Sequence, residues 1–310
     1  MENTRAKSTR NSLILLLTAT IWGMAFVSQS KGMDYMHPFT FNGVRSLIGA
    51  SGILVYILIS RKIAGDKAVP LDLKLNVKAG LLCGIFLTIA STLQQFGIKY
   101  TSVGKAGFIT TLYIIFVPMF GIFLKKKVAP VVWAAAVMAA VGMYLLCMTE
   151  SLRLGAGDIM VFLCAIAFAI QIMTVDHYAA KIDGAVVSCI QFTVCGVVCC
   201  IGALIWGQPA FSQLQEGLGA LLYAGVLSCG VGYTLQIVGQ KGLNPTVAAL
   251  IMSLESVIAT ISGWIAYKIG FLTTDQTLTP RQIAGCVIVF AAVILVQLPP
   301  EWFRFGKKNA

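Results

Sequence analysis

Ten runs of about 18 to 24 predominantly apolar residues divide the chain, and each is long enough to cross a bilayer as a helix. Inside hydrocarbon the backbone must satisfy its own hydrogen bonds, and an α-helix does so within one segment. The runs therefore predict an all-α polytopic membrane protein with ten transmembrane helices. The expected spans cover residues 12–30, 38–60, 77–98, 103–124, 130–148, 158–175, 185–206, 217–238, 246–269 and 281–298.

Composition excludes a soluble globular protein, because 58% of the residues are hydrophobic and only 11% are charged, against about a quarter in soluble domains. The net charge of +11 would suggest nucleic acid in a soluble protein. Here most basic residues flank the apolar runs, so we expect the lipid bilayer and no nucleic acid as a partner. The nine cysteines fall inside expected spans without a CxxC pair, so neither a metal site nor a cofactor is expected.

An internal repeat aligns without gaps. Residues 234–268, shifted back by 142 positions, lie over residues 92–126, and ten of the 35 pairs are identical, among them Gln94 with Gln236. Such self-similarity indicates a duplicated unit. We therefore predict two repeats of five helices, residues 1–150 and residues 151–310, joined by the polar stretch 149–157.

Five spans in each repeat have a geometric consequence, because an odd number makes the second repeat enter the membrane from the opposite face. The segments on the N-terminal side of the membrane hold 16 Lys and Arg residues and those on the other side hold six, so both termini are predicted to be cytoplasmic. Two inverted five-helix repeats are a common plan of secondary transporters, whose substrate site lies near the midplane. This inference from architecture to transport is an association and not a mechanism.

Several short motifs, in this order and spacing, resemble the drug/metabolite transporter superfamily of the EamA type. They are Trp22-Gly23, Arg45, Leu112-Tyr113 with Pro118, Leu254-Glu255-Ser256-Val257, and the stretch LTPRQIAG at residues 278–285. The resemblance covers nearly the whole chain. It implies a ten-helix permease with a central cavity and transport of small metabolites, often efflux of amino acids or related compounds.

Glu255 is the most informative single residue. Counting 1.5 Å per residue from Thr246 places it about 14 Å into its span, near the midplane. A carboxylate at that depth costs about 3 kcal/mol on insertion, so it should face a cavity or a hydrogen-bonding partner. Its counterpart 142 positions earlier is Tyr113, expected at a similar depth. Both residues either line a substrate or proton site or serve only as helix-to-helix contacts.

Arg45 lies inside the second expected span and would either pair with Glu255 or an anionic substrate group, or extend to the headgroups and join helices. Pro118 is expected to bend the fourth span. The remaining candidates are polar side chains in apolar helices, which suit substrate contacts and helix-to-helix hydrogen bonds equally well. They are Trp22, Gln94, Gln95, Gln171 and Gln236.

These observations favour a secondary transporter, an exporter of small metabolites such as amino acids or drug-like compounds, in the cell (inner or plasma) membrane. Access would alternate around a midplane cavity, and proton coupling at Glu255 is a hypothesis. A non-transporting scaffold or sensor is the alternative reading. A membrane-embedded enzyme is less favoured, because the expected core holds one carboxylate, no histidine and no set of catalytic residues.

Overall fold

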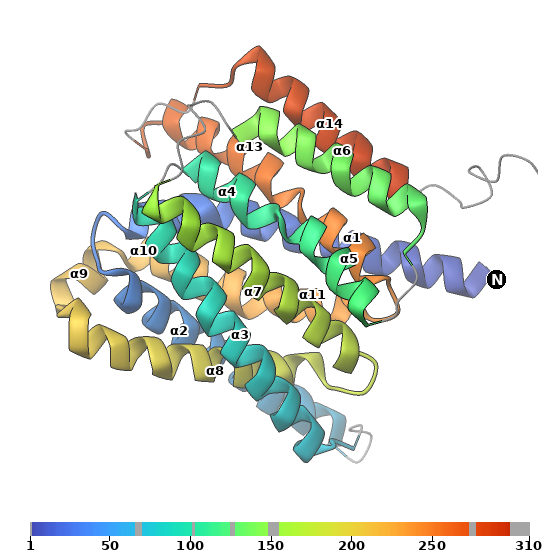
Figure 1. Cartoon of the computed structure of the whole chain (residues 1–310). Helices are drawn as coiled ribbons and strands as arrows, with labels where there is room; N and C mark the ends of the chain where they lie inside the picture. Colours follow the sequence, from blue (N-terminus) through green and yellow to red (C-terminus); the bar gives the residue numbers. More distant parts are fainter. Residues whose placement is uncertain are drawn as a thin grey trace, which may run out of the picture.

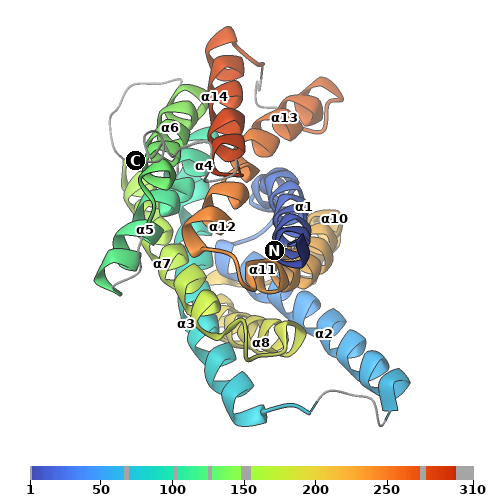
Figure 2. The ribbon, with the colours of Figure 1, turned by 90° about the vertical axis from the view of Figure 1, so that its right-hand side faces the viewer.

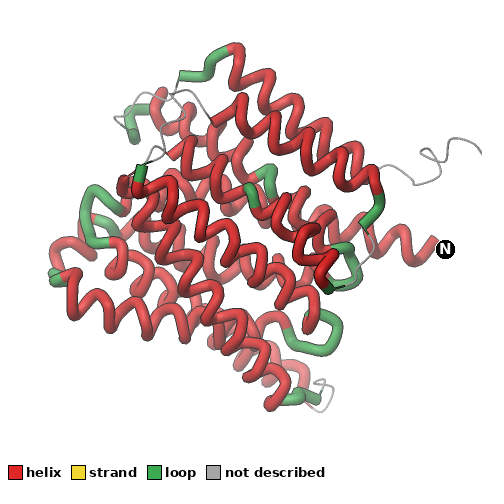
Figure 3. The backbone as a smooth tube through the Cα atoms, viewed as in Figure 1, coloured by secondary structure: helices red, strands yellow, loops and turns green. Residues whose placement is uncertain are grey.

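Helices make up all the regular structure that the computed structural model describes (Figures 1 and 3). It describes residues 2–65, 70–100, 103–124, 128–147, 155–272 and 277–297, and no strand occurs in these ranges. The predicted all-α class is therefore confirmed. Residues 149–154 of the predicted linker lie outside the described residues.

Each of the ten expected segments is helical. In the first half these are α1 (Glu2–Gly32), α2 (Pro38–Ala64), α3 (Leu73–Tyr100), α4 (Val103–Thr111) with α5 (Tyr113–Phe123), and α6 (Pro130–Cys147). In the second half these are α7 (Ala156–Tyr178), α8 (Gly184–Gly202) with the π-helix η2 (Ala203–Gly207), α10 (Leu218–Leu222) with the π-helix η3 (Tyr223–Gly232) and α11 (Tyr233–Gln240), α12 (Pro245–Met252) with α13 (Glu255–Lys268), and α14 (Pro280–Gln297). A short helix, α9 (Phe211–Glu216), precedes α10.

Eight helical stretches within the described ranges are long and apolar enough to cross a membrane. The apolar parts of α6 and α14 are shorter. Large apolar side chains also cover the outside of the bundle, with Ile63, Phe123 and Leu204 at least 75% exposed. So large an exposed apolar surface needs lipid around it. The chain is an integral multi-pass membrane protein.

Local sequence signals set where several helices begin. Asp183 accepts hydrogen bonds from the backbone of Ala185 at 2.9 Å and so caps α8, and Asn244 caps α12 through the backbone of Thr246 at 2.9 Å. Such caps satisfy backbone N–H groups that have no partner within the helix. Pro245 follows Asn244 as the first helical residue, where its missing N–H costs nothing.

Helices from the two halves pack against each other throughout the bundle. Helix α3 packs on α7, α2 on α8, α1 on α13, and α6 on α14, which lie side by side in Figures 1 and 2. Gly97 and Gly157 allow α3 and α7 to approach closely, since a Cβ atom on either would lie 3.0 Å from the other's carbonyl oxygen. The two halves therefore form one body with an extensive shared interior.

Two of the expected spans are interrupted, and the interruptions occupy equivalent positions of the repeat. α4 ends at Thr111 and α5 begins at Tyr113, while α12 ends at Met252 and α13 begins at Glu255. At both breaks the chain makes a tighter turn. The N–H of Leu112 donates to the carbonyl of Ile109, and in the second copy the N–H of Leu254 donates to the carbonyl of Ile251. The sequence predicts each span as a single helix, with a bend at Pro118 in the fourth span only.

Each break has a residue with a hydroxyl group at the equivalent position, whereas only the first copy has a proline nearby. Thr111 donates its hydroxyl to the carbonyls of residues 107 and 108, and Ser253, its counterpart 142 positions later, donates to that of residue 250. Side-chain bonds of this kind compete with the helical ladder and bend helices. Pro118 lies inside α5, six residues beyond the break, and the second copy has Thr260 there.

Candidate functional site

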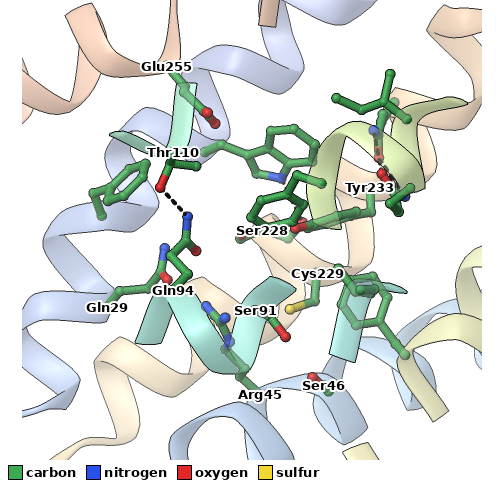
Figure 4. A pocket seen from close by; sticks show the side chains of 18 of the residues that line it. Gln29, Arg45, Ser46, Ser91, Gln94, Thr110, Ser228, Cys229, Tyr233 and Glu255 are labelled. Atoms are coloured by element: carbon green, nitrogen blue, oxygen red, sulfur yellow. Dashed lines mark hydrogen bonds between the residues drawn. The ribbon is translucent and has the colours of Figure 1, made fainter. Parts of the chain in front are cut away.

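A cavity lies between the two halves of the bundle, where both broken helices approach α1, α2, α3, α7, η3 and α11 (Figure 4). Its volume is about 40 Å³, which is room for a few water molecules. Sites for drug-sized ligands usually measure about 300 Å³ or more. Binding of a metabolite here therefore requires the surrounding helices to move apart.

The internal repeat organises the lining of this cavity. Eight of its nineteen described lining residues form four pairs separated by 142 positions, the offset of the internal repeat in these spans. The pairs are Leu87 with Cys229, Ser91 with Tyr233, Gln94 with Gln236, and Tyr113 with Glu255. The two copies of the repeat therefore contribute equivalent positions to one shared site.

Tyr113 and Glu255 meet across the cavity. The Tyr113 hydroxyl donates a hydrogen bond to Oε1 of Glu255 at 3.1 Å, and the two side chains are 3% and 5% exposed. Each residue opens the second piece of its broken helix. The dipole of α13 favours negative charge at that end, so the helix break offers the carboxyl group a polar environment within the membrane.

Arg45 lies on the opposite side of the cavity from Glu255 in Figure 4 and is only 6% exposed. Its guanidinium stands over the ring of Phe41 at 5.2 Å, and its Nε has no hydrogen-bonding partner among the described residues. Within the described part of the chain no carboxylate forms an ion pair with it. The alternative in which Arg45 pairs with Glu255 is therefore not realised, and the side chain is buried rather than extended to the surface.

The four glutamines predicted from the sequence divide into three that line the cavity and one that lies behind its wall. Gln171 and Gln236 exchange hydrogen bonds of 3.5 and 3.2 Å, and Gln94 donates to the hydroxyl of Thr110 at 3.3 Å. Gln95 is fully buried and does not line the cavity. It donates to the backbone carbonyl of residue 29 at 3.3 Å and so connects α3 with α1.

Aromatic rings form one wall of the cavity. The rings of Trp22 and Tyr233 are 4.5 Å apart, and Tyr233 meets Phe192 edge-on at 5.0 Å. Trp22 also donates its Nε1 hydrogen to the carbonyl of Ser228 in η3 at 3.4 Å. Packed aromatic rings of this kind give a firm apolar surface for a ligand.

Sequence reasoning missed several lining residues, among them Gln29, Phe26 and Tyr233. Gln29 is a polar residue in an apolar helix, which is the same signal that singled out Gln94 and Gln171. Its Oε1 is buried without a partner in the described part of the chain, although the side chain faces the cavity. No group of three or more His, Cys, Asp or Glu residues able to hold a metal ion occurs in the described ranges.

The chain is similar to known transporters over most of its length. The model of the EamA-like transporter family matches it twice, at residues 10–148 and 155–298. An uncharacterized transporter of Archaeoglobus fulgidus is 27% identical over 92% of this chain and 84% of its own length. The transporter YwfM of Bacillus subtilis, also uncharacterized, is 25% identical over 94% of each chain.

Solved structures include the same fold. One crystal structure of a protein superposes with a TM-score of 0.74 over 97% of this chain and 99% of its own length, at 15% sequence identity. At that identity the likeness concerns the fold alone. The family match covers both halves of the chain and confirms the resemblance drawn from its motifs. This membrane transporter belongs to the EamA-like transporter family.

Proposed function

We propose that the chain is a secondary transporter that exports small zwitterionic metabolites, with amino acids as the leading class. The cavity lining carries this proposal, because paired positions from two repeats enclose a site with one cation and one carboxyl group. Alternating access fits the small volume of the cavity, about 40 Å³, since a substrate of metabolite size enters only when the helices separate.

The proposed architecture is two five-helix repeats, residues 1–150 and 151–310, inserted in opposite orientations. Under this topology ten helices cross the inner or plasma membrane, and both termini are cytoplasmic. The equivalent breaks in α4/α5 and α12/α13 support it, because broken helices at matching positions of inverted repeats accompany midplane substrate sites. Relative movement of the two repeats would then open the cavity to one side at a time.

The charges of the cavity suggest how a zwitterion would bind. Arg45 has an Nε without a partner among the described residues, which suits a carboxylate group of the substrate. Glu255 and the similarly unsatisfied Oε1 of Gln29 can accept hydrogen bonds from an ammonium group. The aromatic wall around Tyr233 would contact the apolar part of the substrate.

Flux through proteoliposomes tests this function. We expect radiolabelled amino acids, offered as a mixture, to exchange across the membrane in the presence of the protein. Arg45→Gln should lower this flux at least ten-fold, because one charge-assisted contact in a dry site contributes about 1.5–3 kcal/mol. Lys99→Gln, which removes a charge outside the cavity, should leave flux unchanged. Transport of cationic compounds alone would contradict the zwitterion assignment.

Proton coupling at Glu255 is a separate part of the proposal. Among the cavity-lining residues, Glu255 alone carries a carboxyl group. Glu255→Gln keeps the shape and the bond from Tyr113 but cannot exchange a proton. We expect this variant to retain exchange between equal pools and to lose the response of net flux to an imposed pH gradient. An unchanged pH response would exclude Glu255 as the coupling group.

A further inference from the structure

A second pocket lies at the far end of α2, separate from the central cavity. It has a volume of about 640 Å³ and shares no lining residue with the cavity. Three segments enclose it: residues 56–64 and 70–76 at the junction of α2 and α3, the loop between α7 and α8, and the C-terminal part of α11. We name it the α2–α11 pocket.

Three basic residues from different segments line the part of this pocket that the structure describes. Arg61 lies in the last turn of α2, Lys181 in the loop before α8, and Lys241 directly after α11. The sequence assigns all three to the same side of the membrane, the side expected to be cytoplasmic. Convergence of basic side chains between helices at that face is typical of sites for phosphate-bearing lipid headgroups.

The two carboxylates in the described part of the pocket are engaged in local structure. Asp183 accepts two backbone hydrogen bonds at the start of α8, and its Oδ2 lies 3.7 Å from Arg61. Asp72 accepts the backbone N–H of Leu75 at 2.9 Å and so caps α3. Both carboxylates therefore act as helix caps. Asp183 also pairs with Arg61.

The two lysines keep donors for a ligand. Nζ of Lys241 donates to the carbonyl of Ile182 at 3.3 Å, which holds the side chain at the pocket wall and leaves two of its three hydrogens. Lys181 is exposed, and no carboxylate in the described ranges lies within ion-pair distance of it. The described part of the pocket thus presents two ammonium groups without acidic partners.

The rest of the wall includes apolar side chains beside the polar Ser60, Asn76 and Thr234. Tyr56 is 61% exposed, and Ile57 and Val238 line the pocket beside it. Figure 2 shows the C-terminal part of α2 extending away from the bundle, so this wall borders the expected lipid-facing side. Ile63, further along α2, is 81% exposed. A site with ammonium groups at one end and apolar side chains below them matches an anionic phospholipid.

We propose that the α2–α11 pocket binds the phosphate group of an anionic molecule through Lys181 and Lys241, with Arg61 beside them. The apolar wall favours a phospholipid as the source of that phosphate. This inference concerns a site outside the transport cavity and does not depend on the proposed function. A lipid bound here would connect the end of α2 with the α7–α8 loop.

Thermal unfolding of the purified full-length protein in neutral detergent tests the proposal. Phosphatidylglycerol should raise the midpoint temperature, and phosphatidylcholine at the same concentration should not. Lys181→Gln and Lys241→Gln should each raise the half-maximal phosphatidylglycerol concentration about five-fold, the effect expected of one basic side chain at an anionic surface. Lys99→Gln is the matched control, because it removes the repeat counterpart of Lys241 outside the pocket.

Soluble anions distinguish the source of the phosphate. If glycerol phosphate or inorganic phosphate stabilises the protein with the same dependence on the two lysines, the ligand is a soluble phosphate compound and the lipid assignment fails. The proposal as a whole is overturned if no phosphate compound raises the midpoint, or if Lys99→Gln weakens the response as much as the pocket variants. Lys181→Gln alone decides the test should Lys241→Gln not fold, since the exposed Lys181 side chain can be changed without disturbing the packed interior.

Discussion

Single residues give the cavity its chemistry, and the bond between Tyr113 and Glu255 is the contact most open to measurement. It joins equivalent positions of the two repeats at 3.1 Å, in a region where both side chains are buried. A buried polar group that loses its partner costs more than the bond itself contributed. The stability of the protein should therefore respond strongly to a change at either residue.

We expect Tyr113→Phe to lower the free energy of unfolding by about 1–3 kcal/mol, because the carboxyl group of Glu255 loses its donor. Tyr56→Phe, at an exposed ring, should have no measurable effect. The free energies of Tyr113→Phe, Glu255→Gln and the double variant, measured by denaturant unfolding in detergent, form a double-mutant cycle. Additive effects in that cycle would show that the two side chains do not interact.

For single residues, the sequence predicts which side chains belong to the site better than it predicts which of them contact each other. The offset of 142 positions is enough to relate Tyr113 to Glu255, and it relates Gln94 to Gln236 in the same way. Rotamers and helix rotation decide which polar groups meet, and a linear pattern does not contain them. For this reason the sequence leaves open whether Arg45 meets Glu255, and it does not separate Gln95 from the cavity-lining amides.

Among the structural elements, the broken helices carry the clearest expectation. Thr111→Val and Ser253→Ala remove the hydroxyls that bond to helix carbonyls at the two breaks. The residues around each break should then form a more regular helix, with slower amide hydrogen exchange measured by mass spectrometry in peptides 108–118 and 250–260. Thr174→Val is the control, because Thr174 makes the same kind of bond within the unbroken α7. Unchanged exchange would remove the hydroxyls as the cause.

The start of α2 should respond to pH. His37 accepts the backbone N–H of Phe39 through Nδ1 at 3.3 Å, and burial together with the charge of Lys99 lowers the pKa of its imidazole. A pKa lower in the folded than in the unfolded state means that acidification favours unfolding. Stability from this group is therefore present above the unfolded pKa of about 6.5 and is lost as the pH falls through the folded value.

Thermal unfolding between about pH 7 and pH 5 measures this effect, since an unperturbed histidine titrates there. We expect His37→Asn, which keeps an acceptor but does not titrate, to lose less of its midpoint temperature on acidification than the unmodified protein. His177→Asn provides the comparison at the other histidine. An identical pH response of His37→Asn and the unmodified protein would contradict the capping role.

Helix positions follow from the sequence, but helix interruptions do not. The length of each apolar run predicts the ten segments, and one tight turn inside a run does not shorten it. The sequence predicts a bend at Pro118 in the fourth span, whereas the helix breaks at Thr111. The π-helical turns of η3 also leave no signal, because they depend on how Ser228 and its neighbours meet α1 and α2.

For the whole molecule, the proposed inverted arrangement of the repeats makes a prediction about residues 142 positions apart. Lys99 and Lys241 are equivalent in the repeat and should lie on opposite sides of the membrane. In a cysteine-free background, Lys99→Cys should react with an impermeant maleimide in intact cells, and Lys241→Cys only after permeabilisation. Labelling of both variants from the same side would exclude inverted repeats.

The lining of the cavity also restricts how anything can sit inside it. A cavity lined by two equivalent halves would bind a ligand equally well in either of two orientations related by a two-fold rotation. Arg45 and Glu255 remove that equivalence. The starts of α2 at Pro38 and α8 at Gly184 make Gln191 the counterpart of Arg45, and Tyr113 is the counterpart of Glu255. Neither counterpart carries a charge at neutral pH. Charges placed asymmetrically in a pseudo-symmetric cavity select one of the two orientations, so the proposed zwitterionic substrate would bind in a single orientation.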